Sequence, residues 1–400
     1  MPRPAPPTSG PSSDIDLFSH ATLTDPYPAY ATLRDLGPAV HLPRHDIWAL
    51  PRYDEALAVL KDSDTFVSDE AVALTDLANT TILKGTVLAA DGPVHARLRR
   101  PLSRQLGRRA LAGRRPDVHE LADATVRRHV AAGTFDAAEM VREFVAGIVL
   151  EWMGLPEVTR DTVLDAAAAI FDAFGPESER YFKALPVAGA MAAFLAQEVT
   201  RDKVRPDSWL GALYDAADEG LIHQTDVVPL MSAYVAAGLD TTILGLTTTL
   251  RLLAEHPEQY ERLRGETPAS SPVGAFTEAL RIEAPVQGFG RKAARDTHIG
   301  DIAIPAGSQV WILYGSTGRD ARKWGDTADT FDIDRPDSAD HLTLGAGAHT
   351  CAGNHLATLQ GEALLTALAA QVPALKPAGT PEREFNQVLR GHATLPLTVA

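Results

Sequence analysis

A ten-residue segment near the end of the chain carries its most informative chemistry: Leu344-Gly345-Ala346-Gly347-Ala348-His349-Thr350-Cys351-Ala352-Gly353. Glycine permits backbone conformations barred to other residues and lets a flat ligand approach the chain closely. A pattern that predicts a helix over residues 353–370 begins directly after the cysteine. A thiolate at the start of a helix is stabilised by the helix dipole and by unpaired N–H groups. The segment therefore predicts a loop that presents one thiolate to a large, planar group.

Four interpretations of this segment compete. A cysteine thiolate that binds haem iron fits the small-residue loop. Gly345 and Gly347 could instead be half of a dinucleotide-binding fingerprint, although the third glycine is out of register and no strand precedes them. Cys351 could be a nucleophile with His349 as its base, or simply a small buried residue. The segment by itself leaves these alternatives open.

Charge and composition exclude several classes of protein. The 400 residues include 37 Lys+Arg and 52 Asp+Glu, which gives a formal charge of −15, and 45% of them are hydrophobic. This is typical of a globular chain rather than a disordered one, and the negative charge gives no reason to expect binding to nucleic acid or to an anionic membrane. Cys351 is the only cysteine, so an intramolecular disulfide and a cysteine-rich zinc site are excluded.

The pattern along the chain predicts a mainly α fold with small β-sheets. Residues 1–13 are rich in Pro and Ser without the apolar core of a signal peptide, so we expect a disordered tail, then a single domain over residues 14–400. The apolar run over residues 227–239 is too short to cross a bilayer, and a cytoplasmic location is expected. Helical periodicity is found over residues 25–38, 53–60, 102–112, 118–132, 141–153, 162–174, 185–199, 226–254, 257–264, 275–282 and 353–370. Strand signals are found over residues 40–42, 47–50, 292–299 and 309–314.

Two opposite charges lie in the helix predicted over residues 275–282. Glu278 and Arg281 are three residues apart, so they share one face of the helix and can form an ion pair. In isolation the pair could equally be a common feature of an exposed helix surface.

The long helix predicted over residues 226–254 contains Ala237-Gly238-Leu239-Asp240-Thr241-Thr242. The small residues Ala237 and Gly238 leave space beside the helix. Asp240 and Thr241 are polar groups in an apolar helix, where an unpaired buried hydroxyl costs about 1–3 kcal/mol. A proton relay would account for them, and so would a helix bend at Gly238 with Thr241 bonded to the backbone.

Potential donors to an anionic ligand occur in three places. His95 and Arg99 are four residues apart and so share one helix face. Together with Arg291 and His349, they could surround a pair of carboxylates. Each of these residues in isolation could be an ordinary surface charge.

These four motifs, in this order, resemble those of the cytochrome P-450 superfamily of haem-thiolate monooxygenases. The cysteine loop of that family runs Phe-x-x-Gly-x-x-x-Cys-x-Gly; Gly347, Cys351 and Gly353 match it, and Leu344 stands where the family usually has Phe. The departure leaves the ligand in place and removes an aromatic cover from the thiolate. The resemblance extends over essentially the whole chain, from Asp25 onward.

The resemblance implies the cytochrome P-450 fold, a triangular prism with haem b between the long central helix and the helix after the cysteine loop. It implies Cys351 as the iron ligand, Asp240 and Thr241 as a proton relay, and Glu278 with Arg281 as a structural pair. The expected reaction inserts one oxygen atom from O2 into a small organic, aromatic substrate by hydroxylation or O-demethylation. The haem-binding residues implied are His95, Arg99, Ala237, Gly238, Arg291, Leu344, Gly345, His349, Cys351 and Gly353.

Electrons are expected from a ferredoxin and its reductase, because the chain has no room for a flavin domain. Residues 95–116 hold eight arginines and no acidic residue, namely Arg97, Arg99, Arg100, Arg104, Arg108, Arg109, Arg114 and Arg115. This basic segment would attract an acidic ferredoxin to the thiolate face. A solvated helix face with a basic bias is the alternative.

Several segments resemble bacterial members of the family that oxidise para-substituted benzoates, namely residues 171–176, 236–242, 283–287 and 385–391. Phe171 and Phe174 could clamp an aromatic ring, or they could simply belong to the core. The substrate-pocket candidates are Ile82, Val87, Leu88, Phe171, Phe174, Ser232, Ala233, Val286, Phe289 and Leu389.

The same region departs from that branch in its polar groups. Lys84, Thr86 and Ser232 are the remaining candidates to hold a substrate carboxylate, and Gly290 replaces a bulk expected beside the haem. A wider pocket would suit a larger aromatic natural product, oxidised by coupling or another non-hydroxylating reaction. A haem-thiolate sensor without turnover is a further alternative, against which the Asp240–Thr241 pair argues.

Overall fold

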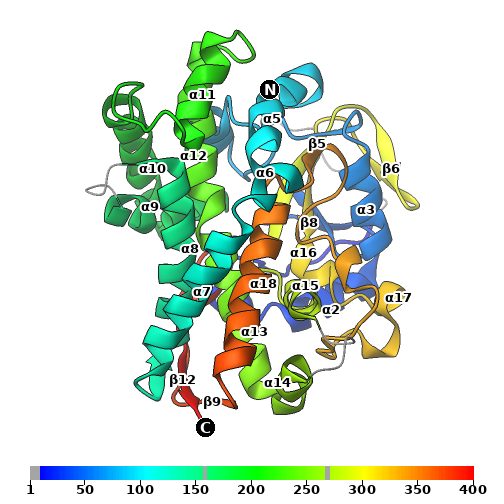
Figure 1. Cartoon of the computed structure of the whole chain (residues 1–400). Coiled ribbons are helices and arrows are strands. Elements are labelled where there is room, and N and C mark those ends of the chain that lie inside the picture. The colour runs from blue at the N-terminus through cyan, green and yellow to red at the C-terminus, as the bar shows by residue number, and fades with distance from the viewer. Residues whose placement is uncertain (1–9, 156–159, 266–270) are drawn as a thin grey trace.

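Figure 1 shows the computed structural model of the chain, and the structure describes residues 10–155, 160–265 and 271–400. Helices dominate, which confirms the predicted mainly α fold. The α-helices are α1 (His20–Thr24), α2 (Tyr27–Leu36), α3 (Tyr53–Lys61), α4 (Asp76–Ala78), α5 (Gly92–Leu106), α6 (Arg108–Ala112), α7 (Arg115–Val130), α8 (Ala137–Met153), α9 (Arg160–Asp172), α10 (Glu179–Glu198), α11 (Trp209–Asp218), α12 (Val227–Gly238), α13 (Asp240–Glu255), α14 (Pro257–Arg264), α15 (Pro272–Ile282), α16 (Tyr314–Thr317), α17 (Ala321–Trp324) and α18 (Asn354–Gln371). The strands are β1 (Val40–Leu42), β2 (Ile47–Leu50), β3 (Phe66–Val67), β4 (Thr134–Asp136), β5 (Gly288–Ala293), β6 (Thr297–Ile299), β7 (Ile302–Ile304), β8 (Gln309–Leu313), β9 (Leu375–Pro377), β10 (Glu382–Phe385), β11 (Arg390–Thr394) and β12 (Pro396–Val399).

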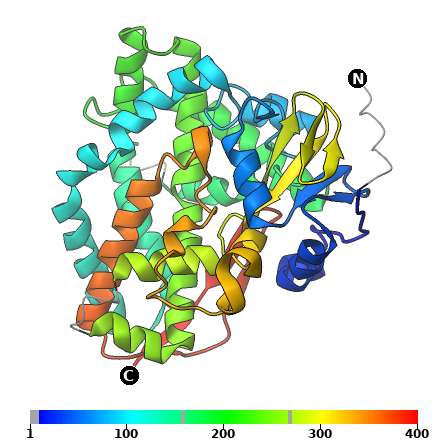
Figure 2. The ribbon, with the colours of Figure 1, turned by 90° about the vertical axis from the view of Figure 1, so that its right-hand side faces the viewer.

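The sheet that contains β5 and β8 lies at one side of a larger helical body (Figure 2), whereas β9 and β12 lie near the C-terminus, away from it (Figure 1). The largest sheet has the order β1-β2-β8-β5-β3. In it β2 and β8 are parallel, and the other neighbouring strands are antiparallel. β4-β12-β9, β10-β11 and β6-β7 form the remaining sheets. Each of these small sheets buries too little to stand alone, so it depends on the helices against which it packs.

Most of the predicted elements are present, and the differences have local causes. The helix predicted over residues 102–112 is divided into α5 and α6, because the backbone at Gly107 is extended (φ −70°, ψ 153°). α5 also begins earlier, at Gly92, and carries a proline in its first turn, where a missing N–H is tolerated. The strand predicted over residues 292–299 is divided between β5 and β6. α11 and the C-terminal strands have no counterpart among the predicted elements.

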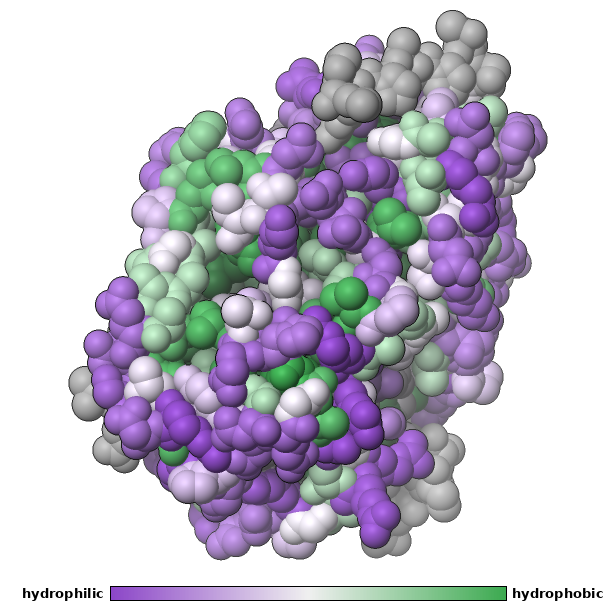
Figure 3. Space-filling view, turned by 90° about the horizontal axis from the view of Figure 1, so that it is seen from above, coloured by the Kyte–Doolittle hydropathy of each residue, from purple (hydrophilic) through white to green (hydrophobic). Residues whose placement is uncertain are grey.

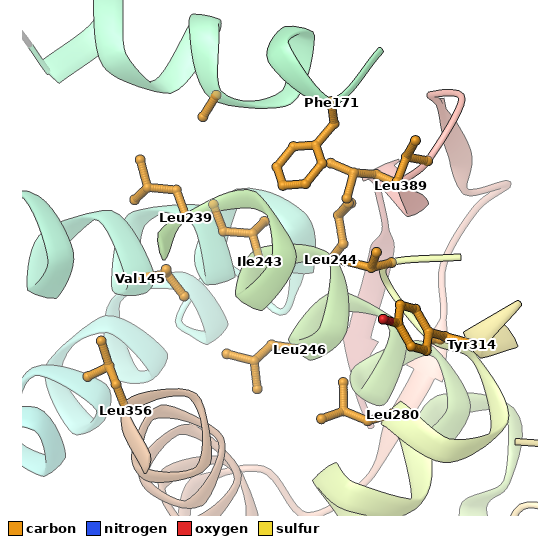
Figure 4. Packing of buried hydrophobic residues seen from close by; sticks show 14 of the residues in the cluster. Val145, Phe171, Leu239, Ile243, Leu244, Leu246, Leu280, Tyr314, Leu356 and Leu389 are labelled. Carbon is orange, nitrogen blue, oxygen red and sulfur yellow. The ribbon is translucent and has the colours of Figure 1, made fainter. Parts of the chain in front are cut away.

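The central helix is broken where the sequence predicts one continuous helix over residues 226–254. α12 ends at Gly238 and α13 begins at Asp240, with Leu239 between them at φ −108° and ψ −79°. α13 packs against α8 and α15, and its Leu246, Leu250 and other apolar side chains are buried (Figure 4). The break places Asp240 at the start of a helix, inside the core.

The stretch Gln224–Glu255 is long and apolar enough to cross a membrane by length and composition, with a mean hydropathy of 1.5. The prediction based on residues 227–239 therefore underestimated the length of this apolar stretch. The core helix of a soluble protein meets the same criterion, and 56% of the most apolar window is buried against the rest of the chain.

The N-terminal segment joins the fold earlier than predicted. Residues 1–9 lie outside the described part of the chain, whereas residues 10–13 lie along β1. The Ser13 N–H donates to the His41 carbonyl at 3.0 Å, and the His41 N–H donates to the Pro11 carbonyl at 2.8 Å. The disordered tail predicted over residues 1–13 is therefore wrong for residues 10–13, because β1 offers them an unpaired edge.

Candidate active site

The cysteine loop is shaped by two glycines in the left-handed region. Gly345 has φ +70° and Gly347 has φ +68°, which side chains other than glycine rarely adopt. A Cβ at Gly347 would lie 2.6 Å from the backbone oxygen of Leu60, so glycine is also required there by close packing against α3. The Cys351 N–H donates to the Leu344 carbonyl at 2.8 Å and closes the loop. α18 then begins at Asn354.

The thiol of Cys351 lies at the start of α18 in a desolvated position. Burial raises its pKa, while the backbone N–H groups of Gly353 and Asn354 and the guanidinium of Arg99 oppose that rise. Burial is the largest of these effects, so the thiolate needs a further positive partner to be stable here. A bound metal ion is such a partner.

His349 is engaged away from the cysteine. Its Nε2 lies 3.2 Å from Asp91 Oδ1 and 3.2 Å from Ser68 Oγ. The Asp91 carboxylate also accepts the Ser68 N–H at 2.8 Å, so it fixes the imidazole relative to the loop before α5. Sequence reasoning missed Asp91, although an acid directly before a Gly-Pro helix start is a recognisable capping signal. The interpretation of His349 as a base for Cys351 finds no hydrogen bond between the two residues in the described part of the chain.

Donors predicted to face an anionic group converge near this loop. His95 is buried, its ring centroid lies 4.4 Å from that of His349, and its Nε2 has no hydrogen-bond partner. Burial, followed by the nearby His349 and Arg99, lowers the pKa of His95 to about 4. Arg99 donates to the Thr350 carbonyl, which joins α5 to the cysteine loop. Arg291 is buried and donates to the Gly290 carbonyl at 2.7 Å.

On either side of the break in the central helix, a small residue, Ala237, is exposed and an acidic residue, Asp240, is buried. Ala237 is exposed although Val235 and Leu239, two residues away on either side, are fully buried. The Asp240 carboxyl is buried, and its Oδ2 has no partner. Burial raises the pKa of Asp240 to about 7, against the opposing effect of Arg142 on α8. The Thr241 hydroxyl donates to the Ala237 carbonyl at 2.9 Å, as the alternative of a helix bend with a backbone-bonded threonine predicts.

Glu278 and Arg281 form a fully buried ion pair in α15. Arg281 donates to Glu278 through Nε at 2.6 Å and through Nη2 at 2.7 Å, and both side chains are 0% exposed. Arg281 also donates to the carbonyls of Gly318, Ala328 and Thr330. Arg335 adds a second guanidinium, 3.2 Å from Glu278 Oε1. The interpretation as an exposed helical ion pair is therefore wrong; the pair fastens α15 to the segment that leads to the cysteine loop.

Comparison with known proteins identifies the fold and the family. The family model for "Cytochrome P450" matches residues 274–386. The chain is 35% identical over 391 residues to cytochrome P450 CYP199A2 of Rhodopseudomonas palustris, which covers 97% of this chain and 94% of that protein. The chain belongs to the cytochrome P450 family. It is also 31% identical to the monooxygenase PikC of Streptomyces venezuelae, over 97% of this chain and 94% of that one.

Solved structures agree with this assignment. The solved structure of cytochrome P450 CREJ in complex with (4-ethylphenyl) dihydrogen phosphate superimposes with a TM-score of 0.83, at 26% identity, over 94% of this chain and 98% of that one. CYP109E1 of Bacillus megaterium gives a TM-score of 0.85 at 22% identity, over 95% of this chain and 99% of that one, and supports the fold alone. As a cytochrome P450, the protein is a monooxygenase that uses haem b with cysteine thiolate ligation and O2 as co-substrate.

The residues around the cysteine fit such a group. The thiol of Cys351 can bind a metal. The unpartnered, buried imidazole nitrogen of His95 and the guanidiniums of Arg99 and Arg291 can donate to anionic side groups of the same ligand. The exposed Ala237 lies in a helix whose flanking apolar residues are buried, which leaves an uncovered surface in the centre of the cytochrome P450. These are the features expected where a large planar group covers the chain.

The predicted substrate-pocket residues fall into an aromatic row and an aliphatic border. The ring centroids of Phe171 and Phe174 are 5.3 Å apart, those of Phe174 and Phe289 are 6.1 Å apart, and those of Phe289 and Tyr314 are 6.2 Å apart. Phe171 points toward Leu389 and α13 (Figure 4). Phe171 and Phe174 are each 3% exposed, so the side chains themselves are part of the core, as the alternative interpretation has it.

The remaining pocket candidates lie on four segments. Ile82 belongs to a single π-helical turn (Asn79–Leu83), and Val87 and Leu88 follow it; all three are half-buried. Ser232 and Ala233 are half-buried on α12. Val286 and Leu389 are buried and form an antiparallel bridge between the segments before β5 and β11. The face of the molecule in Figure 3 is largely hydrophilic, with apolar side chains gathered around a hollow.

Gly290 does not widen the pocket. A Cβ at this position would lie 2.1 Å from the Ala71 carbonyl oxygen and 3.2 Å from that of Val72. The Gly290 N–H donates to that same Val72 carbonyl at 3.0 Å. The missing side chain is therefore required by backbone packing of residues 71–72 against β5, and the prediction of a wider pocket on this ground is wrong.

The arginine-rich segment divides into paired and unpaired side chains. Arg97 pairs with Asp226, and Arg115 pairs with Glu362 on α18. Arg114 lies over the Trp152 ring at 4.9 Å. Within the described residues, no hydrogen bond or ion pair is formed by the exposed side chains of Arg100, Arg108 and Arg109.

Proposed function

We propose that this cytochrome P450 hydroxylates or O-demethylates a small, para-substituted aromatic compound that it holds mainly by apolar contacts. The observation that carries the proposal is the half-buried Phe289 ring, which contacts the buried rings of Phe174 and Phe171 behind it. The Val286–Leu389 bridge borders this row. Aromatic side chains in offset or tilted contact form a surface that accepts a further ring with favourable geometry.

Haem would be held by the cysteine loop and by the donors from α5 and β5. Cys351 would supply the thiolate ligand, and His95, Arg99 and Arg291 would bind the anionic groups of the porphyrin, with His349 held by Asp91. When bound, haem with a thiolate ligand supplies the activation of O2 for insertion of one oxygen atom. Ala237 and Gly238 would leave the space that the flat group needs.

Asp240 and Thr241 would move protons in the apolar centre of the protein. With its pKa raised to about 7, the Asp240 carboxyl both holds and releases a proton near neutral pH. The Thr241 hydroxyl donates to the Ala237 carbonyl, so its oxygen can accept a hydrogen bond. To pass a proton on, this hydroxyl would turn its own proton from the carbonyl toward the acceptor as it takes one up. The pair would therefore deliver protons at the position where the helix is broken.

The substrate end of the pocket favours a neutral ring over a free carboxylate. The hydroxyl of Thr86 donates to the Leu83 carbonyl at 2.7 Å, and that of Ser232 donates to the Val228 carbonyl at 3.1 Å. Both hydroxyl protons are therefore already donated to backbone carbonyls, and the Lys84 side chain is exposed. A carboxylate that lost its water here would lack a donor, at a cost of several kcal/mol. The solved structure of CREJ contains (4-ethylphenyl) dihydrogen phosphate, a para-substituted phenyl compound. Its phosphate is anionic, so this ligand supports the para-substituted ring of the proposed substrate and not the absence of charge.

Electrons would enter through the unpaired arginines of α5 and α6. Arg99 connects α5 to Thr350, the residue before the cysteine, so this arginine-rich surface borders the thiolate side of the site. Arg100, Arg108 and Arg109 would attract an acidic ferredoxin, which raises the association rate more than the affinity.

A spin-state titration tests the substrate class. We would titrate the ferric holoprotein with 4-methoxybenzoate and with its methyl ester, which carries the same ring and para substituent without the charge. The ester is expected to produce the larger low-to-high-spin change. A change with the free acid only would refute neutral binding, and no change with either compound would refute the small aromatic substrate. Formaldehyde release during turnover then distinguishes O-demethylation from ring or side-chain hydroxylation.

A further inference from the structure

A second cluster of charged side chains is buried away from the cysteine loop. It is built where the β10–β11 hairpin packs on α13 and on the segment that follows α15. Four guanidiniums share this space with one imidazole, one phenol ring and one buried carboxylate: Arg251, Arg319, Arg383, Arg390, His392, Tyr27 and Glu283. The proposed reaction uses none of them.

The carboxylates do not balance the guanidiniums. Glu283 lies 2.7 Å from Arg251 Nη2 and 3.9 Å from Arg319 Nη2. Arg251 has a further partner in Glu255, and Arg319 has one in Asp329, both at the exposed rim. Among the described residues, Arg383 and Arg390 have no acidic partner within ion-pair distance, although Glu283 attracts both from farther away. Four cations thus face three carboxylates, and the excess positive charge falls on the β10–β11 hairpin.

Several donors in the cluster lack acceptors. Among the described residues, four buried nitrogen atoms have no hydrogen-bond partner: Nε of Arg251, Nη1 of Arg383, Nε of Arg390 and Nδ1 of His392. The buried hydroxyl of Tyr27 has none there either. Arg390 is 7% exposed and His392 is 6% exposed. An unpaired buried donor costs about 1–3 kcal/mol, and more when it is charged. Four such atoms in one cluster are therefore costly unless something accepts from them.

The geometry brings these donors together. Arg383 and His392 are directly opposed in the register of β10 and β11. Arg390 is fixed at the start of β11 by donating to the carbonyls of Leu23 and Thr24, at 3.2 Å and 3.1 Å. Gly391 lies against α13, where a Cβ would be 2.6 Å from Leu244 Cδ2. This close approach packs the hairpin on α13 about two turns before Arg251, and the charge of Arg251 acts on His392.

Two further observations agree with an electropositive space. The guanidiniums of Arg319 and Arg390 lie 3.6 Å and 5.2 Å from the centroid of the Tyr27 ring, which is a favourable position for a cation. Burial, followed by the charges of Arg383 and Arg251, lowers the pKa of His392 to about 4. The imidazole is therefore neutral near pH 7 and donates through one of its ring nitrogens.

We propose that Arg251, Arg383, Arg390 and His392 bind a small monovalent inorganic anion of the size and charge of chloride between the β10–β11 hairpin and α13. One negative charge neutralises the excess, and one spherical acceptor serves several donors that point from different elements. The anion would fasten the hairpin, whose second strand β11 begins directly after Leu389.

Thermal unfolding of the holoprotein in sodium chloride and in sodium gluconate, at equal ionic strength, tests the proposal. A ligand that binds only the folded state raises the unfolding midpoint, and the rise increases with the ligand concentration. The midpoint is expected to be higher in chloride by at least about 2 °C. Arg383→Gln removes this difference, and Arg127→Gln, a change at an exposed arginine of α7, retains it.

Equal midpoints of the wild-type protein in the two salts would overturn the proposal, as would a chloride effect that survives in Arg383→Gln. If Arg383→Gln does not fold, Arg383→Lys replaces it, since it keeps the charge and loses the planar donor set; its chloride effect should be reduced. Crystals grown in sodium bromide give an independent result. An anomalous peak between Arg383 and His392 is expected, and a cluster without one contradicts the site.

Discussion

Replacing Asp240 with Asn tests two properties of this acid separately: the free energy cost of burying its ionised carboxyl, and its role in proton supply. The pKa of Asp240 rises from 3.8 to about 7 because the carboxyl is buried. The folded protein therefore holds the proton more tightly than the unfolded chain does, and ionisation destabilises the fold progressively as the pH rises from about 4 to about 7. At 1.36 kcal/mol for each unit, the full cost is about 4 kcal/mol. About 2.5 kcal/mol of it falls between pH 5 and pH 8 by the same linkage.

Asn has nearly the same shape as Asp and does not ionise. We expect the Asp240→Asn holoprotein to match the wild type most closely at about pH 5 and to exceed it by about 2–5 °C in Tm at about pH 8. The same variant should lose most of its product formation, because the proton supply is gone. Asp117→Asn, at an exposed position of α7, is the control and should show no pH-dependent gain. A Tm difference that is constant over this pH range would refute the assignment of a buried, proton-holding acid.

Four other changes have defined outcomes. Glu278→Gln leaves its arginine partner buried without a counter-charge and should lower stability by about 3–5 kcal/mol; a thermal midpoint equal to wild type would contradict the buried pair. Gly290→Ala forces a methyl group against the carbonyl of residue 71 and should destabilise the fold by about 1–3 kcal/mol, with a lower Tm and little change in substrate affinity. An unchanged Tm with altered substrate affinity would show instead that this glycine lines the substrate pocket. Arg108→Glu combined with Arg109→Glu should slow ferredoxin-driven turnover and flatten its salt dependence, while dithionite reduction and substrate binding stay at wild-type values. Cys351→Ser should keep the far-ultraviolet circular dichroism and lose the long-wavelength Soret band of the reduced carbon monoxide complex, and retention of that band would refute thiolate ligation.

The cysteine loop and the helix types could be predicted from the sequence because they depend on local properties. The glycines at 345 and 347 are needed for their backbone conformation, and both have the positive φ that the sequence suggests. Apolar periodicity of 3.6 residues likewise predicts the long helices, since each helix must bury one face whatever it packs against. The mainly α fold and the cytochrome P450 family follow from these local signals.

Pairings between distant segments were decided only by the tertiary structure. The reason for glycine at 290 is a carbonyl more than two hundred residues earlier in the chain, and no local pattern contains that information. The burial of Glu278 and Arg281 depends on the segment over residues 318–335, which converts a pair that could lie on the surface into one that holds the core together. The break at Leu239 and the unpaired arginines of the β10–β11 hairpin are of the same kind. A sequence specifies which groups are polar and how a helix turns; only the packed chain determines which of those groups lose their water and which neighbours they meet when they do.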